Sequence, residues 1–164
     1  GYFTSMNPFC GQLPLPNDST AYFDLDLNND SETDFKIEIK HYEQELTQYC
    51  GHCGIFHIKT IQVKPLNSGG FISVDTASNY WIRNYDTTQI ISNSDIWTNE
   101  YVTSLLQDGC MTPYVSFEDA YWGLKLDNMI AWIHIERLNN NGLRIKEFAY
   151  NMTKNNSIKV GQKK

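Results

Sequence analysis

Two alternating segments on either side of an acidic stretch place the strongest constraint on how this chain folds. Residues 20–27 alternate between apolar and polar side chains, and residues 35–40 do the same. A period of two indicates a β-strand with one buried face. The stretch between them is rich in Asp and Asn, which favour turns, so the pattern predicts a β-hairpin. A slip of one residue would turn each apolar face to water, which fixes the register.

The acidic stretch itself predicts a calcium-binding loop. Its oxygen-bearing side chains recur at every second position, the spacing by which a tight turn points several hard oxygens at one Ca²⁺. A first possible ligand set is Asp26, Asn28, Asp30 and Asp34. A second is Asp24, Asp26, Asn28 and Glu32. The sequence leaves both registers open, together with a hairpin loop in which these residues act only as turn formers.

This loop differs from an EF-hand in two respects. Ile37 and Phe35 stand where the closing Glu of that motif would be in the two registers, and both belong to a predicted strand. Ser31 occupies the first-register position where Gly is usual, which makes the sharp turn more costly. We therefore expect a bound ion to order the loop rather than to perform chemistry.

Turn residues divide the middle of the chain into further strands. Residues 55–64, 71–74 and 80–85 are predicted strands, and Pro65 ends the first of them. The pattern is looser over residues 94–107, where Ser and Asp precede spaced apolar residues. This segment predicts one short helix.

The last third of the chain gives the clearest pattern. Residues 121–126, 129–138 and 143–151 predict three strands joined by short turns, an antiparallel meander. Many short strands with at most one short helix predict an all-β fold, either an antiparallel β-sandwich or a partly closed barrel. We expect residues 1–19 to form an extended leader and residues 20–164 a single β domain.

Charge and hydropathy argue against two classes of partner. The chain has thirteen Lys and Arg against nineteen Asp and Glu, a net charge of −6, and its basic residues are mostly scattered. Nucleic acid is therefore not expected as a partner. No apolar run reaches about eighteen residues, so no transmembrane segment is expected. The chain begins at Gly1 rather than Met, which favours an exported chain whose signal has been removed.

Four cysteines in a polar chain favour an oxidising compartment and a disulfide. They are Cys10, Cys50, Cys53 and Cys110. Cys50 can close on Cys53 and Cys10 on Cys110, but nothing local fixes either pair. The Cys-Gly-His-Cys motif at residues 50–53 matches a redox motif, yet it runs into a predicted strand rather than a helix. A structural disulfide or reduced thiols are expected before a redox or zinc centre.

Aromatic residues make up 13% of the chain and are expected mostly in the core. Tyr80, Trp81 and Tyr85 are the best candidates for an exposed platform that stacks on sugar rings, because Arg83 and Asp86 lie among them.

Several carboxylates are available for hydrolytic chemistry, but their spacing does not pair them. These are Glu100, Glu118, Asp119 and Glu136. No nucleophile elbow, zinc-protease motif or phosphate-binding glycine loop is present. Catalysis is therefore not the leading expectation.

Five segments resemble secreted or surface all-β domains of Gram-negative bacteria. Residues 121–126, 131–135 and 145–151 resemble the Y-x-G-x-K, Y-G-W and D-Y-A-Y-N strands that close those domains, residues 23–35 their aspartate-rich opening hairpin, and residues 65–70 their P-L-x-x-G turn. The resemblance implies an exported or surface protein without a generally assigned activity, and it supplies no catalytic residues.

Together these patterns predict an exported, non-catalytic structural or binding module with a calcium-ordered hairpin loop. It would be periplasmic, extracellular or at the cell surface, with a glycan or another surface protein as partner. A carbohydrate-binding module is the second hypothesis and a small hydrolase the third.

Overall fold

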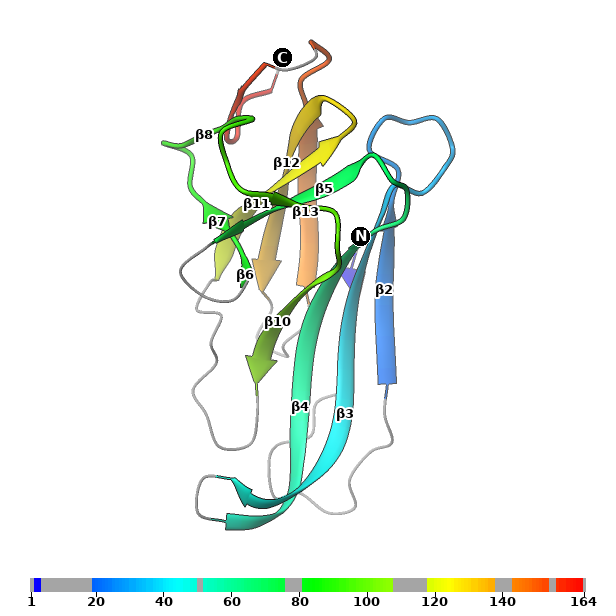
Figure 1. Cartoon of the computed structure of the whole chain (residues 1–164), viewed down its shortest axis with the longest axis vertical. Coiled ribbons are helices and arrows are strands. Elements are labelled where there is room, and N and C mark those ends of the chain that lie inside the picture. The colour runs from blue at the N-terminus through cyan, green and yellow to red at the C-terminus, as the bar shows by residue number, and fades with distance from the viewer. Residues whose placement is uncertain are drawn as a thin grey trace.

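The computed structural model is an all-β fold of antiparallel sheets packed together (Figure 1). It describes residues 2–3, 19–49, 52–75, 81–107, 118–137, 143–153 and 156–163. The strands are β1 (Tyr2–Phe3), β2 (Ser19–Leu25), β3 (Phe35–Tyr49), β4 (His52–Pro65), β5 (Gly70–Asp75), β6 (Trp81–Ile82), β7 (Asn84–Tyr85), β8 (Ile90–Ile91), β9 (Trp97–Thr98), β10 (Val102–Gln107), β11 (Asp119–Leu126), β12 (Met129–Arg137), β13 (Leu143–Tyr150) and β14 (Ile158–Lys159). Within these ranges, no helix long and apolar enough to cross a membrane occurs.

Two main sheets form the sandwich. The larger has the order β1-β13-β12-β11-β5-β6, with β7 added beside β11 and β9 beside β5. The smaller has the order β10-β4-β3-β2, and β14 pairs with β8 in a third, two-stranded sheet. As far as the structure describes the chain, none of the sheets closes into a barrel. The all-β prediction is therefore confirmed, in its sandwich form.

The first hairpin forms as the alternating pattern predicts. Phe23 lies opposite Ile37, and Leu25 lies opposite Phe35, so the apolar faces of β2 and β3 coincide. The acidic loop, residues 26–34, connects the two strands. The meander of β11, β12 and β13 is also confirmed, with one irregularity of register on β12 between His134 and Ile135.

The main core lies between the two large sheets. Alternate residues of every long strand contribute to it, which is why each strand carries an apolar period of two. Its fully buried members include Phe35, Ile37, Ile61, Leu124 and Ile133. The large sheet thus presents one face of β11 and β12 to the smaller sheet.

A second core covers the opposite face of the large sheet, which the sequence analysis did not predict. It consists of Tyr85, Ile91, Ile130, Trp132, Ile158 and Val160. Segments distant in the sequence supply it, since β8 pairs with β14 near the C-terminal end of the chain. β12 is consequently buried on both faces, and its apolar residues run almost without interruption.

The structure differs from the sequence-based predictions in two segments. The helix predicted over residues 94–107 is wrong, because this segment forms β9 and β10, with Val102 opposite Val63 of β4. Pairing with an existing strand satisfies its backbone groups better than one short, weakly patterned helix would. The expected leader also contributes β1, whose Tyr2 lies opposite Arg144 of β13.

The cysteine predictions fall largely outside the described residues. Cys10, Cys50 and Cys110 lie outside them, and for Cys53 in β4 only the backbone is described. A disulfide therefore stays a prediction.

Candidate functional site

Side chains of the acidic loop turn toward the loop's own backbone. Asp26 accepts hydrogen bonds from the backbone amides of Asp30 (3.1 Å) and Ser31 (2.8 Å). Asn28 accepts a second bond from the Asp30 amide (3.0 Å), and its side-chain nitrogen donates to the Asp30 carboxylate (2.8 Å). The bond that Asp30 accepts from the Glu32 amide, followed by the one from Asn28, lowers the pKa of Asp30. Because Asp26 and Asn28 share one donor, their oxygens converge.

Two loop residues adopt the left-handed backbone conformation that calcium-loop turns require. Asn29 has a φ of 62° and Ser31 a φ of 74°. Asn tolerates this region well, whereas Ser at such a φ carries a steric cost that Gly would not. The turn is therefore held by the side-chain bonds of Asp26 and Asn28 rather than by a glycine.

Asp34 has a different environment from the other acidic residues. It is only 2% exposed, and its two carboxylate oxygens accept hydrogen bonds from the Leu27 amide (2.8 Å) and the Asn67 side chain (2.9 Å). Its backbone carbonyl also accepts a bond from the Leu66 amide (2.8 Å). Asp34 thus fastens the acidic loop to the turn between β4 and β5.

The remaining predicted ligands are spread along the hairpin. Asp24 faces Lys36 across the strands, 3.7 Å from its ammonium, and Glu32 is exposed. In the part of the chain that the structure describes, no three His, Cys, Asp or Glu side chains are grouped closely enough to hold a metal ion. Asp26, Asn28 and Asp30 are the set that hydrogen bonds connect, and calcium binding stays a prediction.

The predicted aromatic platform is not formed by Tyr85. This residue is 3% exposed in the second core, with its hydroxyl 2.5 Å from that of Ser73 and the Arg83 guanidinium 4.7 Å from its ring centroid. Trp81 is partly buried against the main core, and Tyr80 lies outside the described residues. The expectation that Tyr85 is exposed is therefore wrong, because Tyr85 belongs to β7, which pairs with β11, and its ring packs in the second core.

Burial of Tyr85 has a consequence at high pH. Loss of hydration, opposed by the hydrogen bond with Ser73, raises the pKa of Tyr85 to about 12. An unfolded tyrosine ionises near pH 10. The unfolded chain therefore binds fewer protons than the folded one from about pH 10 to 12, and stability falls as the pH rises through that window. We expect the free energy of unfolding to fall more steeply there in the wild type than in Tyr85→Phe.

Urea unfolding at a series of pH values measures this difference. Tyr101→Phe is the matched control, since it removes the hydroxyl of a tyrosine that is 64% exposed. Equal slopes for the wild type and Tyr85→Phe would contradict a raised Tyr85 pKa.

A charged cluster surrounds His134 on the outer face of the large sheet. His134 is 8% exposed; its Nε2 bonds Asp119, and its Nδ1 lies 3.7 Å from Glu147. Lys146 lies 3.3 Å from Asp119, and Lys163 pairs with Glu147. The bond from Lys163 is the main reason that the pKa of Glu147 is lowered. Each carboxylate is shared between the imidazole and an ammonium, which ties the C-terminal segment to the sheet.

Tyr121 joins this charged cluster to the second core. Its ring stacks on His134 with centroids 4.1 Å apart and meets the edge of Trp132 at 5.3 Å. Burial, followed by the charges of Glu147 and Asp119, raises the pKa of Tyr121. The sequence analysis did not single out His134, because the C-terminal residue Lys163, which pairs with its neighbour Glu147, is distant in the sequence.

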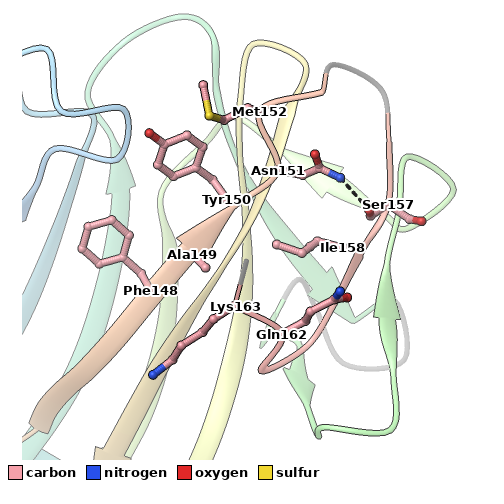
Figure 2. Close-up of a pocket in the computed structure, with 9 residues that line it drawn as sticks. All are labelled: Phe148, Ala149, Tyr150, Asn151, Met152, Ser157, Ile158, Gln162 and Lys163. Atoms are coloured by element: carbon pink, nitrogen blue, oxygen red, sulfur yellow. Dashed lines mark hydrogen bonds between the residues drawn. The ribbon is translucent and has the colours of Figure 1, made fainter.

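A cavity of about 390 Å³ lies beside β13 and the C-terminal segment (Figure 2). Phe148, Tyr150 and Met152 line it from one side of β13, and Ala149 and Ile158 from the other. Its polar lining consists of Asn151, Ser157, Gln162 and Lys163. Among the described residues, the lining includes no carboxylate, imidazole or thiol, so its chemistry suits contact with an apolar group. Sequence reasoning missed this site, because β13 reads as an ordinary strand.

Comparisons with protein-family models, curated proteins and solved structures gave no match.

Proposed function

We propose that this protein is an exported, non-catalytic structural or binding module whose first hairpin loop is ordered by calcium. The observation that carries the calcium proposal is the convergence of Asp26 and Asn28 on the Asp30 amide. These side chains are hard oxygen donors held in one exposed turn, the chemistry that Ca²⁺ prefers. A bound ion would offset the repulsion between Asp26 and Asp30 and relieve the cost of the left-handed turn.

The charged side chains of the large sheet support a structural rather than a catalytic role. Asp119 and Glu136 lie opposite each other on β11 and β12, but each is engaged by a cation or imidazole. Arg144 binds Glu136 at 2.9 Å, and Asp119 contacts His134. With these partners, Asp119 and Glu136 resemble members of a stabilising ion-pair network more than the acid and base of a hydrolase.

A carbohydrate-binding module is a weaker second hypothesis. Stacking on a sugar needs an exposed aromatic face on a rigid support. With Tyr85 buried, the predicted platform loses a member, and Trp81 packs against the main core. A structural or protein-binding module is therefore the function that the geometry supports best.

Thermal unfolding with excess chelator and with about 1 mM Ca²⁺ tests the calcium proposal. A site with a Kd near 0.1 mM adds about 1.4 kcal/mol by mass action. In a domain of this size that is a rise in Tm of about 3 to 6 °C. We expect this rise in the wild type and its loss in Asp26→Ala/Asp30→Ala.

The matched control is Asp86→Ala, which removes an aspartate that caps a different exposed turn through Thr88. It should retain the calcium-dependent rise. A wild-type Tm that does not respond to Ca²⁺ would make the acidic loop an ordinary hairpin turn.

A further inference from the structure

Residues 156–163 form a strap over part of the second core and bury two side chains in it. Ile158 is 8% exposed and Val160 is 2% exposed, whereas Lys159 between them is exposed. This alternation is that of a strand with one face toward the protein. Both buried residues belong to the second core, and no residue of the strap belongs to the main core. The strap therefore covers the large sheet without contributing to the interior of the sandwich.

Within the described part of the chain, the main-chain bonds of the strap do not reach the large sheet. β14 pairs with β8 in a two-stranded sheet of its own, and the Val160 amide donates to the Gln89 carbonyl at 3.1 Å. The Gln162 amide donates to the Lys159 carbonyl inside the strap. The strap and β12 meet through the side chains of the second core instead. Departure of the strap would thus break no described ladder bond of either large sheet.

The turn that carries β8 has its own bonds to the large sheet. Arg83 binds Asp95 at 2.8 Å, and Asp95 also accepts a bond from the Ser92 amide at 2.7 Å. The Val74 amide of β5 donates to the Ile96 carbonyl at 2.9 Å. These bonds hold the β8 turn in place whether or not β14 is beside it. The strap is therefore the half of the two-stranded sheet that can leave.

Two features of the second core lower the cost of removing the strap. The indole N–H of Trp132 is fully buried, and the described residues provide no hydrogen-bond partner for it. Water can reach this donor once the strap has left, so opening restores a hydrogen bond that the closed state lacks. In addition, Ile158, Gln162 and Lys163 of the strap line the cavity of about 390 Å³ beside β13 (Figure 2). The strap is thus incompletely packed on that side.

An ion pair joins the end of the strap to β13. Lys163 pairs with Glu147, which also lies 3.7 Å from His134. The Lys163 side chain is 64% exposed, so water and salt screen this pair. Its contribution is correspondingly small, and Ile158 and Val160 are the main anchors of the strap.

We propose that the strap opens as a unit while both large sheets stay folded. Opening breaks the pairing of β14 with β8 and withdraws Ile158 and Val160 from the second core, which uncovers Trp132 and Ala149. Ala149 also lines the cavity, so the open state joins the cavity to the uncovered surface. The strap thus acts as a movable wall of the cavity. Segments with few buried apolar contacts are the ones that open below the free energy of global unfolding.

Amide hydrogen exchange of the full chain, followed by mass spectrometry, tests this opening. Chelator is present throughout, so the result does not depend on the calcium proposal. We expect amides in peptides from residues 156–163 to be protected, but at least tenfold less than amides of the main-core strands β3 and β4. Protection equal to that of β3 and β4 would overturn the inference, because the strap would then open only with the whole fold. A complete lack of protection would also overturn it, because the strap would then not be closed.

Two buried valines provide a matched pair of truncations. Val160 is 2% exposed in the second core, and Val102 is 3% exposed in the main core. Val160→Ala should raise exchange from the strap at least fivefold, because the contacts of Val160 are lost on opening. Val102→Ala should raise exchange from β3 and β4 at least fivefold and leave the strap unchanged, because the contacts of Val102 persist in the open state. Equal acceleration of the strap and of β3 and β4 by Val102→Ala would overturn separate opening.

Low concentrations of urea give a second test that needs no variant. The effect of urea on an opening grows with the surface that the opening exposes. Exchange from the strap should therefore respond weakly to urea, whereas exchange from β3 and β4 should accelerate steeply. The same urea dependence in both regions would show that they open together, which would overturn the inference.

Discussion

Trp122→Ala is expected to lower the free energy of unfolding by about 4 kcal/mol, the largest effect of any substitution considered for this protein. Trp122 is 1% exposed in the main core, and its indole N–H donates to the Asn84 side chain at 2.9 Å. Truncation would leave a large cavity at the centre of the sandwich and remove the partner of Asn84. For a chain of this length the Tm should fall by roughly 8 to 16 °C.

Differential scanning calorimetry or urea unfolding measures the Trp122 effect. Tyr101→Ala is the control, because Tyr101 is a large aromatic residue that is 64% exposed. Its effect should stay within about 0.5 kcal/mol. A loss below about 1.5 kcal/mol in Trp122→Ala would mean that the core closes around the cavity or that Trp122 is not central to it.

Asp34→Ala is expected to cost about 3 kcal/mol, although residues 29–32 of the same loop are exposed. Removing the carboxylate would leave the Leu27 amide and the Asn67 side chain without their acceptor in a buried site. Each buried donor left without a partner costs about 1 to 3 kcal/mol. Asp34→Asn should fall between the wild type and Asp34→Ala, because the asparagine keeps one acceptor oxygen.

Urea unfolding in chelator isolates the Asp34 effect from any bound cation. Asp24→Ala is the matched control from the same hairpin. Asp24 is exposed and faces Lys36 at 3.7 Å, a surface pair worth at most about 1 kcal/mol. If Asp34→Ala cost no more than Asp24→Ala, the hydrogen bonds of Asp34 would not be what holds the loop to its neighbouring turn.

The strands could be predicted from the sequence wherever they are long enough to show a clear pattern between turn residues. The β2–β3 hairpin and the meander of β11 to β13 both follow from local alternation and turn residues, which need no knowledge of distant segments. The short strands β6 to β9 were harder to predict, because a strand of two residues is too short to show an alternating pattern. The helix prediction over residues 94–107 failed because an apolar pattern without clear period takes its form from β4, its pairing partner.

The candidate sites were less predictable than the fold. The acidic residues could be located from their spacing. Which of them turns inward could not be predicted, because Asp34 bonds to Asn67 in a turn that is distant in the sequence. Tyr85 was expected at the surface because β8 and β14, which cover that face, are too short to recognise in the sequence. The place of β13 between β12 and the short strand β1 depends on strand order, which local patterns do not determine.

The pairing of β1 with β13 has a kinetic consequence. These two strands are far apart in the sequence, and β14 likewise returns to the distant strand β8. Contacts so far apart in the sequence require a large loss of chain entropy before they become favourable, so folds dominated by them form in milliseconds to seconds rather than microseconds. During synthesis, neither the β1 side of the sandwich nor the second core can close until the C-terminal strands have emerged. The apolar surface that these strands cover would therefore stay exposed until they are made, the interval in which binding by a chaperone would matter most.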